Sequence, residues 1–148
     1  MGEFQVVVCQ LGHESYGLDI SSVYEIIRFQ ECAAVPACPS FVDGVINLRG
    51  RIIPVMDMAS RFGQSRSETT KSTRIIVAGT NGVRVGLVVD AVTEVLMVSE
   101  DAVEPTPQVA SSYDSAYIRG IAKIGKELVI LLNLSALFGD QEVQAQAA

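Results

Sequence analysis

Few side chains in this sequence have a type and spacing that could support catalysis. His13 is the only histidine, and Glu14 and Ser15 follow it directly. Such a group is too local to act as a triad, because the members of a triad normally converge from separated parts of a fold. We therefore expect His13 to be an exposed histidine in a turn. No glycine cluster of the phosphate-binding type leads from a strand into a helix, so no nucleotide site is expected.

The three cysteines do not form a recognisable metal or disulfide pattern. Cys9, Cys32 and Cys38 could be drawn with His13 as ligands, but their spacing matches no zinc motif and a fourth ligand is missing. An odd number of cysteines also argues against a disulfide framework and is typical of a reducing compartment. We expect buried or idle thiols, with no metal and no cofactor.

Part of the sequence is repeated, and the repeat places two glutamates at equivalent positions. Residues 17–27 recur as residues 86–96 at a constant offset of 69, which places Glu25 and Glu94 at equivalent positions. This equivalence favours a shared structural role over a catalytic carboxylate pair, which would need an acid in a pocket that raises its pKa. A second set of landmarks recurs at an offset of 76: Gly44 with Gly120, Asp57 with Asn133, Phe62 with Phe138, and Gly63 with Gly139.

The elements that carry these landmarks are mostly short strands. A unit of about 70 residues has room for only a very small core, so the two copies are predicted to pack together as a pair of small barrels. One helical turn is expected at 40–43, ended by Gly44, and short helices at 58–62 and 134–138, capped by Asp57 and Asn133. The expected strands are 4–11, 16–20, 25–29, 45–48, 52–56, 74–78, 83–89, 94–98, 118–124 and 128–132.

These elements predict one domain over residues 1–139. Its first strand is placed at 3–11, the core of the first barrel at 15–65 and the second barrel at 73–139, with a polar boundary loop at 63–72. Residues 140–148 are rich in Gln and Ala and are predicted to be a disordered tail.

Charge is distributed unevenly along the chain. The net charge of −6 divides into −5 over residues 1–48, +5 over 49–84 and −6 over 85–148. The basic segment lacks the interleaved aromatic residues of a nucleic-acid platform, so it is either a solvated face or a protein-docking patch. No apolar run approaches the roughly 18 residues of a spanning helix, and no signal-like segment opens the chain, which favours the cytoplasm without membrane insertion.

The segment around the basic turn resembles a known family. The string Gly44-Val-Ile-Asn-Leu-Arg-Gly50, followed by Ile52-Ile-Pro-Val-Met-Asp-Met58, closely resembles the signature of the CheW family of bacterial chemotaxis coupling proteins. The likeness extends over nearly the whole chain in a fixed order, which makes coincidence improbable. It includes residues 16–20, the Val23-x-Glu25-Ile26 step, residues 85–92 and Tyr117-Ile-x-Gly120.

The resemblance implies a non-enzymatic adaptor. Its expected fold is all-β, with two pseudo-symmetric, five-stranded SH3-like barrels packed together and short helices. Its implied partners are the cytoplasmic tip of a chemoreceptor, the regulatory domain of the CheA histidine kinase and other CheW-like domains in rings. It would be cytoplasmic and recruited to membrane-bound receptor arrays.

The resemblance also implies site residues. Receptor-facing positions fall on Val23, Glu25 and Arg49, with Gly44 shaping the turn beneath and Val92 and Val95 in the second half, and Gly120 matches a position linked to kinase contact. A guanidinium on a rigid tip can make a forked bond to a carboxylate or to carbonyls. Solvation remains the alternative for Arg49, and a core role remains the alternative for Val23 and Val92.

Two other functions stay open from the sequence. One is an adaptor of a parallel chemosensory pathway, such as one that controls surface motility. The other is a small-ligand or metal-binding barrel that uses Cys32 or Cys38, which would require ligand-dependent stabilisation or a thiol of low pKa.

Overall fold

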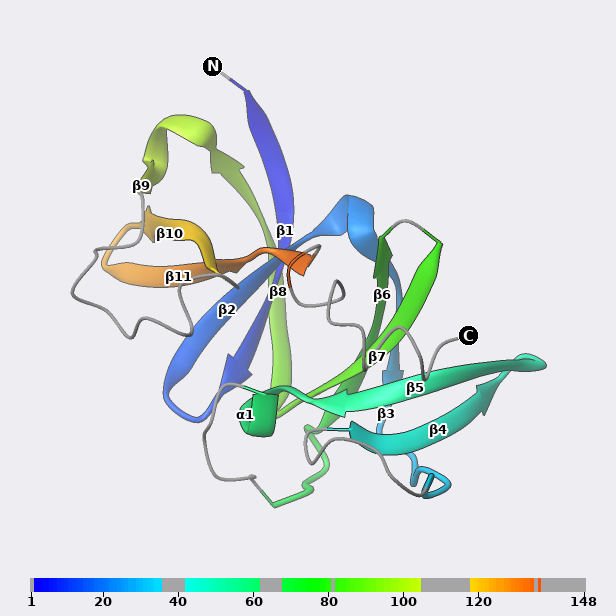
Figure 1. The fold of residues 1–148 in the computed structure, drawn as a ribbon. Helices are drawn as coiled ribbons and strands as arrows, with labels where there is room; N and C mark the ends of the chain where they lie inside the picture. The colour runs from blue at the N-terminus through cyan, green and yellow to red at the C-terminus, as the bar shows by residue number, and fades with distance from the viewer. Residues whose placement is uncertain are drawn as a thin grey trace.

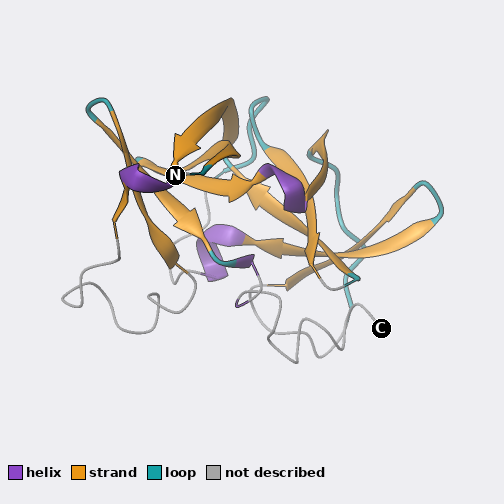
Figure 2. Cartoon of the chain, turned by 90° about the horizontal axis from the view of Figure 1, so that it is seen from above, coloured by secondary structure: helices purple, strands orange, loops and turns teal. Residues whose placement is uncertain are grey.

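The protein is an all-β chain in the computed structural model, which describes residues 2–35, 42–61, 68–80, 82–104, 118–134 and 136. Short helical turns lie between the strands (Figure 2). In chain order the elements are β1 (Glu3–Leu11), β2 (Glu14–Asp19), η1 (Ile20–Ser22), β3 (Val23–Arg28), β4 (Val42–Leu48), β5 (Arg51–Asp57), α1 (Met58–Arg61), β6 (Arg74–Thr80), β7 (Val83–Val89), β8 (Ala91–Ser99), η2 (Glu100–Ala102), β9 (Val103–Glu104), β10 (Ile118–Ile124) and β11 (Glu127–Leu132).

The strands form two curved sheets that lie side by side (Figure 1). One has five strands in the order β3-β6-β7-β5-β4, and the other has six in the order β8-β1-β2-β11-β10-β9. In each, an antiparallel hairpin is flanked by one antiparallel and one parallel neighbour, since β2 pairs with β11 and β7 pairs with β5 in parallel. The expected pair of SH3-like barrels is confirmed, and the two-residue strand β9 makes the second sheet six-stranded.

The sheets do not follow the sequence halves 15–65 and 73–139 that we expected for the two barrels. The hairpin β1–β2 pairs with β8 and β11, and the hairpin β6–β7 pairs with β3 and β5. Each copy of the repeat therefore gives its first hairpin to the other copy's barrel. Sequence similarity marks the copies but not which strand pairs with which, so the exchange of hairpins was not predicted. The proposed tail, 140–148, lies outside the described residues.

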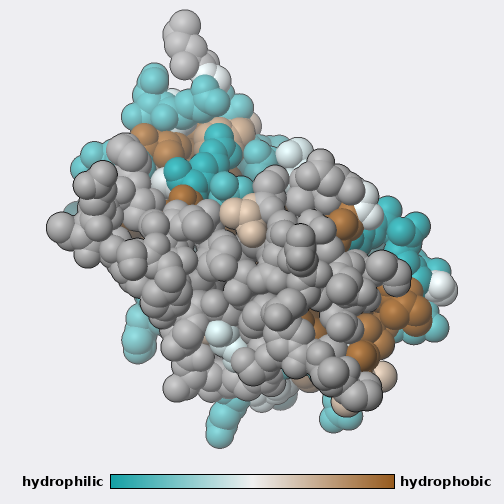
Figure 3. All heavy atoms as spheres, viewed as in Figure 1, coloured by the Kyte–Doolittle hydropathy of each residue, from teal (hydrophilic) through white to brown (hydrophobic). Residues whose placement is uncertain are grey.

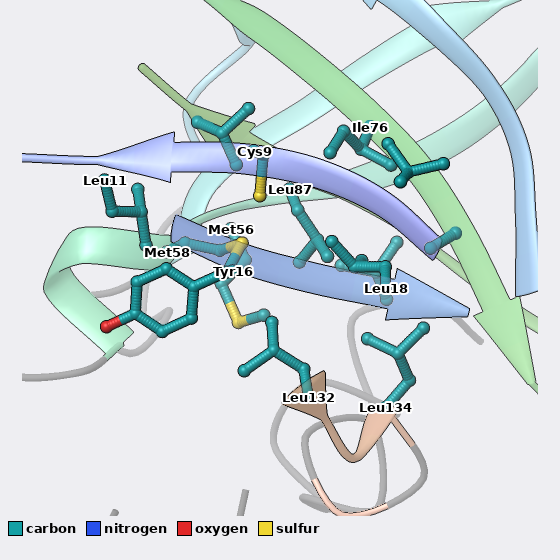
Figure 4. Close-up of a cluster of buried hydrophobic side chains, with 14 residues drawn as sticks. Cys9, Leu11, Tyr16, Leu18, Met56, Met58, Ile76, Leu87, Leu132 and Leu134 are labelled. Atoms are coloured by element: carbon teal, nitrogen blue, oxygen red, sulfur yellow. The ribbon is translucent and has the colours of Figure 1, made fainter. Parts of the chain in front are cut away.

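Among the described residues, three apolar clusters account for the arrangement of the barrels. One lies inside the six-stranded sheet and includes Val6, Val8 and Val129, and a second lies inside the five-stranded sheet and includes Val55 and Ile75. The third and largest lies between the sheets, where side chains from both converge (Figure 4). Its members are Val7, Cys9, Leu11, Tyr16, Leu18, Met56, Met58, Ile76, Ala78, Val85, Leu87, Val89, Leu132 and Leu134.

Strands β1 and β6 are buried on both faces because they belong to two cores at once. Val6 and Val8 point into the barrel, while Val7 and Cys9 join the cluster between the barrels. A strand with two buried faces carries a continuous hydrophobic run in place of an alternating one. This explains the valine run of β1.

Glycine occupies the bulge of β4 and the equivalent bulge of β10. The register shifts between Val42 and Gly44, and again between Ile118 and Gly120. A Cβ at Gly44 would lie 2.1 Å from the Ala33 carbonyl oxygen, and φ at Gly44 is +145°. The expected helical turn at 40–43 is wrong for its last two residues, which belong to β4, because Val42 is buried in register with Met56.

Helix α1 follows the predicted cap Asp57, and Asn133 also acts as a cap, although most of the helix expected at 134–138 lies outside the described residues. The Asp57 carboxylate accepts a hydrogen bond from Ser60 Oγ at 2.7 Å, and Asn133 Oδ1 accepts one from the Ala136 amide at 3.2 Å. Residues 62–67 lie outside the described residues, so the boundary loop is seen only from residue 68 on. In the described ranges, no helix has the length and apolar character needed to cross a membrane.

Candidate partner-binding surface

The hairpin between β4 and β5 holds Arg49 at a rigid tip. Arg49 and Gly50 have φ values of +53° and +82°, the pattern of a two-residue turn that matches the twist of its strands. The Gly50 amide donates to Asn47 Oδ1 at 3.0 Å and closes the turn. A left-handed backbone at a non-glycine residue costs on the order of 1–3 kcal/mol and often marks functional positions.

Arg49 forms an ion pair with Glu25 of β3. The guanidinium Nη1 donates to Glu25 Oε2 at 2.7 Å, and the two side chains are 77% and 25% exposed. Strands β3 and β4 are the two edge strands of the five-stranded sheet, so the ion pair connects one edge to the turn that follows the other. Two of the predicted receptor-facing residues are thus brought together. Arg49 was expected to bond a carboxylate or carbonyls, and within the chain it bonds the carboxylate of Glu25.

The three predicted valines divide into two kinds of position. Val23 and Val92 occupy equivalent places on the edge strands β3 and β8, and both pack partly buried against the cluster between the barrels. Val95, also on β8, is 48% exposed. A core contribution is therefore real for Val23 and Val92, whereas Val95 is available to a partner.

The two predicted glycines are buried and contribute shape. Gly44 admits the Ala33 backbone, which exchanges two hydrogen bonds with Val45 at 2.8 and 2.9 Å. A Cβ at Gly120 would lie 2.9 Å from the Glu104 carbonyl oxygen of β9. A change at Gly44 or Gly120 would therefore affect binding indirectly, by displacing the Ala33 segment or β9.

Large apolar side chains are exposed beside this surface. Tyr24 and Ile26 on β3 are 51% and 39% exposed, and Ile52 next to the hairpin tip is 60% exposed. Hydrophobic colour shows over the β4–β5 side of the molecule at the lower right of Figure 3. Such residues beside charged ones are typical of a protein-binding surface.

Sequence reasoning missed two arginines that line the same hollow as Arg49. Arg51 and Arg84 lie beside Glu25 in a concavity of about 240 Å³. The uneven charge pointed to this segment. Their convergence, however, depends on the parallel pairing of β5 with β7, which no local sequence signal reveals.

The residues considered for catalysis stay separate. His13 is exposed in the β1–β2 turn. Cys9 is fully buried, and desolvation by burial, followed by the nearby Asp90 charge, raises the pKa of its thiol to about 12. A thiol with so high a pKa is a poor nucleophile. Cys38 lies outside the described residues, and among the described ones no three His, Cys, Asp or Glu side chains gather as metal ligands would.

The fold and surface together define a class of protein: a small double barrel with a charged and apolar protein-facing surface. Comparison with known proteins identifies the family. The family description "CheW-like domain" matches residues 5–142. A probable chemotaxis protein CheW of Rhizobium etli is 36% identical over 97% of this chain and 93% of its own length.

Other relatives agree with this match. The chemotaxis protein CheW of Treponema pallidum is 33% identical over 98% of this chain and 88% of that protein. The crystal structure of the scaffolding protein TtCheW from Thermoanaerobacter tengcongensis superposes with a TM-score of 0.85 at 40% identity, covering 93% of this chain and 89% of the other. The chain belongs to the CheW-like family.

Proposed function

We propose that this protein is a non-enzymatic, cytoplasmic chemotaxis scaffold that couples chemoreceptor signalling tips to the CheA histidine kinase. Family membership supports the scaffold role, since the relatives are chemotaxis proteins and one is named a scaffolding protein. These names give no support to the alternatives of surface motility or a metal-binding barrel. The chain is proposed to act through its surfaces and to meet other CheW-like domains in rings at the membrane-bound arrays.

The observation that carries the receptor contact is the Arg49–Glu25 pair. It fixes a guanidinium on a strained turn, at the tip of a hairpin that also carries the exposed Ile52. A guanidinium that is held in one position near exposed apolar side chains can act as a binding hot spot. Val95 extends the proposed receptor-facing surface on the other barrel.

Kinase contact is proposed to depend on Gly120. Because this glycine is buried, its role is to let β9 lie close to β10. There β9 pairs antiparallel with β10, Val103 with Ala122 and Glu104 with Ile121. A side chain at position 120 would displace β9 and with it the barrel edge that the kinase domain is proposed to contact.

The test is binding of the purified protein to a chemoreceptor signalling tip and, separately, to the CheA regulatory domain. Wild type should bind both. Arg49→Glu places like charges beside Glu25 and should weaken tip binding by about tenfold or more, while kinase binding and the melting curve stay near those of wild type. Lys126→Glu reverses a charge on the equivalent tip of the other barrel and is the matched control. Absence of binding to both partners at micromolar concentrations would contradict the proposal.

A further inference from the structure

We infer that Arg51 and Arg84 join Arg49 in an arginine hollow that accepts carboxylates of the chemoreceptor tip. The arginine hollow is the concavity of about 240 Å³ lined by Glu25, Leu48, Arg49, Arg51, Ile53, Val77 and Arg84. This inference rests on the proposed function, because it names the chemistry of the partner at that same surface.

The charges of the arginine hollow do not balance. Three guanidiniums share it with one carboxylate, Glu25, and that carboxylate is bonded to Arg49. The arginine hollow therefore holds an excess of positive charge. An incoming carboxylate relieves it directly.

Two of the three guanidiniums, those of Arg49 and Arg84, are held in place before any partner arrives. Arg49 is fixed by its turn, and the guanidinium of Arg84 lies over the Tyr24 ring at 4.1 Å from the centroid. The Tyr24 ring is itself packed on Gly79, where a Cβ would lie 2.7 Å from Tyr24 Cε2. Donors that are already ordered lose little conformational freedom on binding, so they favour affinity.

The internal ion pair shows which ligand the hollow suits. Arg49 uses Nη1 for Glu25, and a guanidinium has five N–H donors, so donors remain for a second carboxylate. The exposed Tyr24 ring, which lies under the Arg84 guanidinium, adds apolar surface at the edge of the hollow. An acidic protein surface can pair with the guanidiniums and also cover this ring, whereas a free phosphate would leave the ring uncovered.

The barrel fold does not itself require these arginines. By the offsets of 69 and 76, Arg84 is equivalent to Ser15 and Arg51 to Glu127. In the six-stranded barrel those two residues bond each other, with Ser15 Oγ donating to Glu127 Oε1 at 3.1 Å. The same corner therefore carries this Ser–Glu pair beside Lys126 in one barrel and the arginines in the other. The five-stranded barrel concentrates three guanidiniums at this corner, which favours an acidic partner there.

The test measures tip affinity for Arg51→Gln and Arg84→Gln at low and high salt. Each should weaken tip binding about tenfold at low salt, and the loss should shrink in about 0.5 M NaCl because ions screen exposed charges. Arg119→Gln is the matched control, since Arg119 also lies over an aromatic ring, Phe4, at 4.6 Å but on the six-stranded barrel. It should change affinity less than about twofold. Arg84→Lys keeps the charge without the fork and should recover part of the loss.

The possible outcomes distinguish failure of the arginine hollow from failure of the proposed receptor coupling. If wild type fails to bind the tip, the proposed function and the assigned partner fall together. If wild type binds and both glutamine variants bind equally well, only the arginine hollow is refuted. Equal losses in Arg119→Gln would show a general charge effect, and displacement of the tip by inorganic phosphate at constant ionic strength would show a small-anion site. Either result overturns the inference.

Discussion

Replacing Gly44 by alanine is expected to unfold the edge of the five-stranded barrel locally. The new Cβ would lie 2.1 Å from the Ala33 carbonyl oxygen and 3.2 Å from Cys32 Cβ. The first distance is far inside van der Waals contact with a backbone atom, so the segment at Ala33 must move away. The two hydrogen bonds that join Ala33 to Val45 are then lost.

The magnitude follows from these terms. A φ of +145° at a residue with a side chain costs on the order of 1–3 kcal/mol, and each lost hydrogen bond about 0.5–1.5 kcal/mol. Together they predict that Gly44→Ala lowers the free energy of unfolding by about 4 kcal/mol. That is a large part of the roughly 5–15 kcal/mol that stabilises a typical domain.

Urea denaturation followed by circular dichroism measures this change, and Gly12→Ala is the control. Gly12 also has a positive φ, +61°, but a Cβ at this position would meet nothing within 4 Å. The control should therefore lose only the conformational term, about 1 kcal/mol. Equal losses in the two variants would refute the close approach of Ala33 as the reason for glycine at position 44.

Two further predictions concern the core. Burial raises the pKa of the Cys9 thiol from 9.0 to about 12, so the neutral thiol contributes its full stabilisation below pH 9. Between pH 9 and about 12, the free energy of unfolding of wild type should fall relative to that of Cys9→Ala by up to about 1.4 kcal/mol per pH unit. A difference between the two proteins that does not change with pH would contradict this prediction. In urea denaturation, Val92→Ala should lose about 1 kcal/mol and Val95→Ala less than about 0.5 kcal/mol, because only Val92 packs against the core; equal losses would remove the distinction.

Local features of this fold were readable from the sequence. The prolines, glycines and valine runs predicted most strands within about one to three residues, and Asp57 and Asn133 were identified as caps. These features depend on neighbours in the chain. The repeat also predicted two equivalent barrels, because both copies keep the same order of landmarks.

Long-range pairing was not readable in the same way. The exchange of hairpins depends on which of two similar partners a strand finds, and the sequence of β1 or β6 suits either barrel. The Arg49–Glu25 pair and the convergence of Arg84 depend in turn on that pairing. For the same reason, Val23 and Val92 could not be assigned between core and surface before the cluster between the barrels was known.

The exchange of hairpins has a consequence for the order of synthesis. The five-stranded sheet has all its strands once Val89 has left the ribosome. The β1–β2 hairpin is made first, but β1 waits for β8, and β2 waits for β11, which ends at Leu132. During that interval the valine-rich hairpin β1–β2 has neither of its neighbouring strands and presents open edges. Unpaired apolar strands are the species that aggregate in a nascent chain. The amino-terminal hairpin is thus the part of this protein most dependent on rapid completion of translation or on a chaperone.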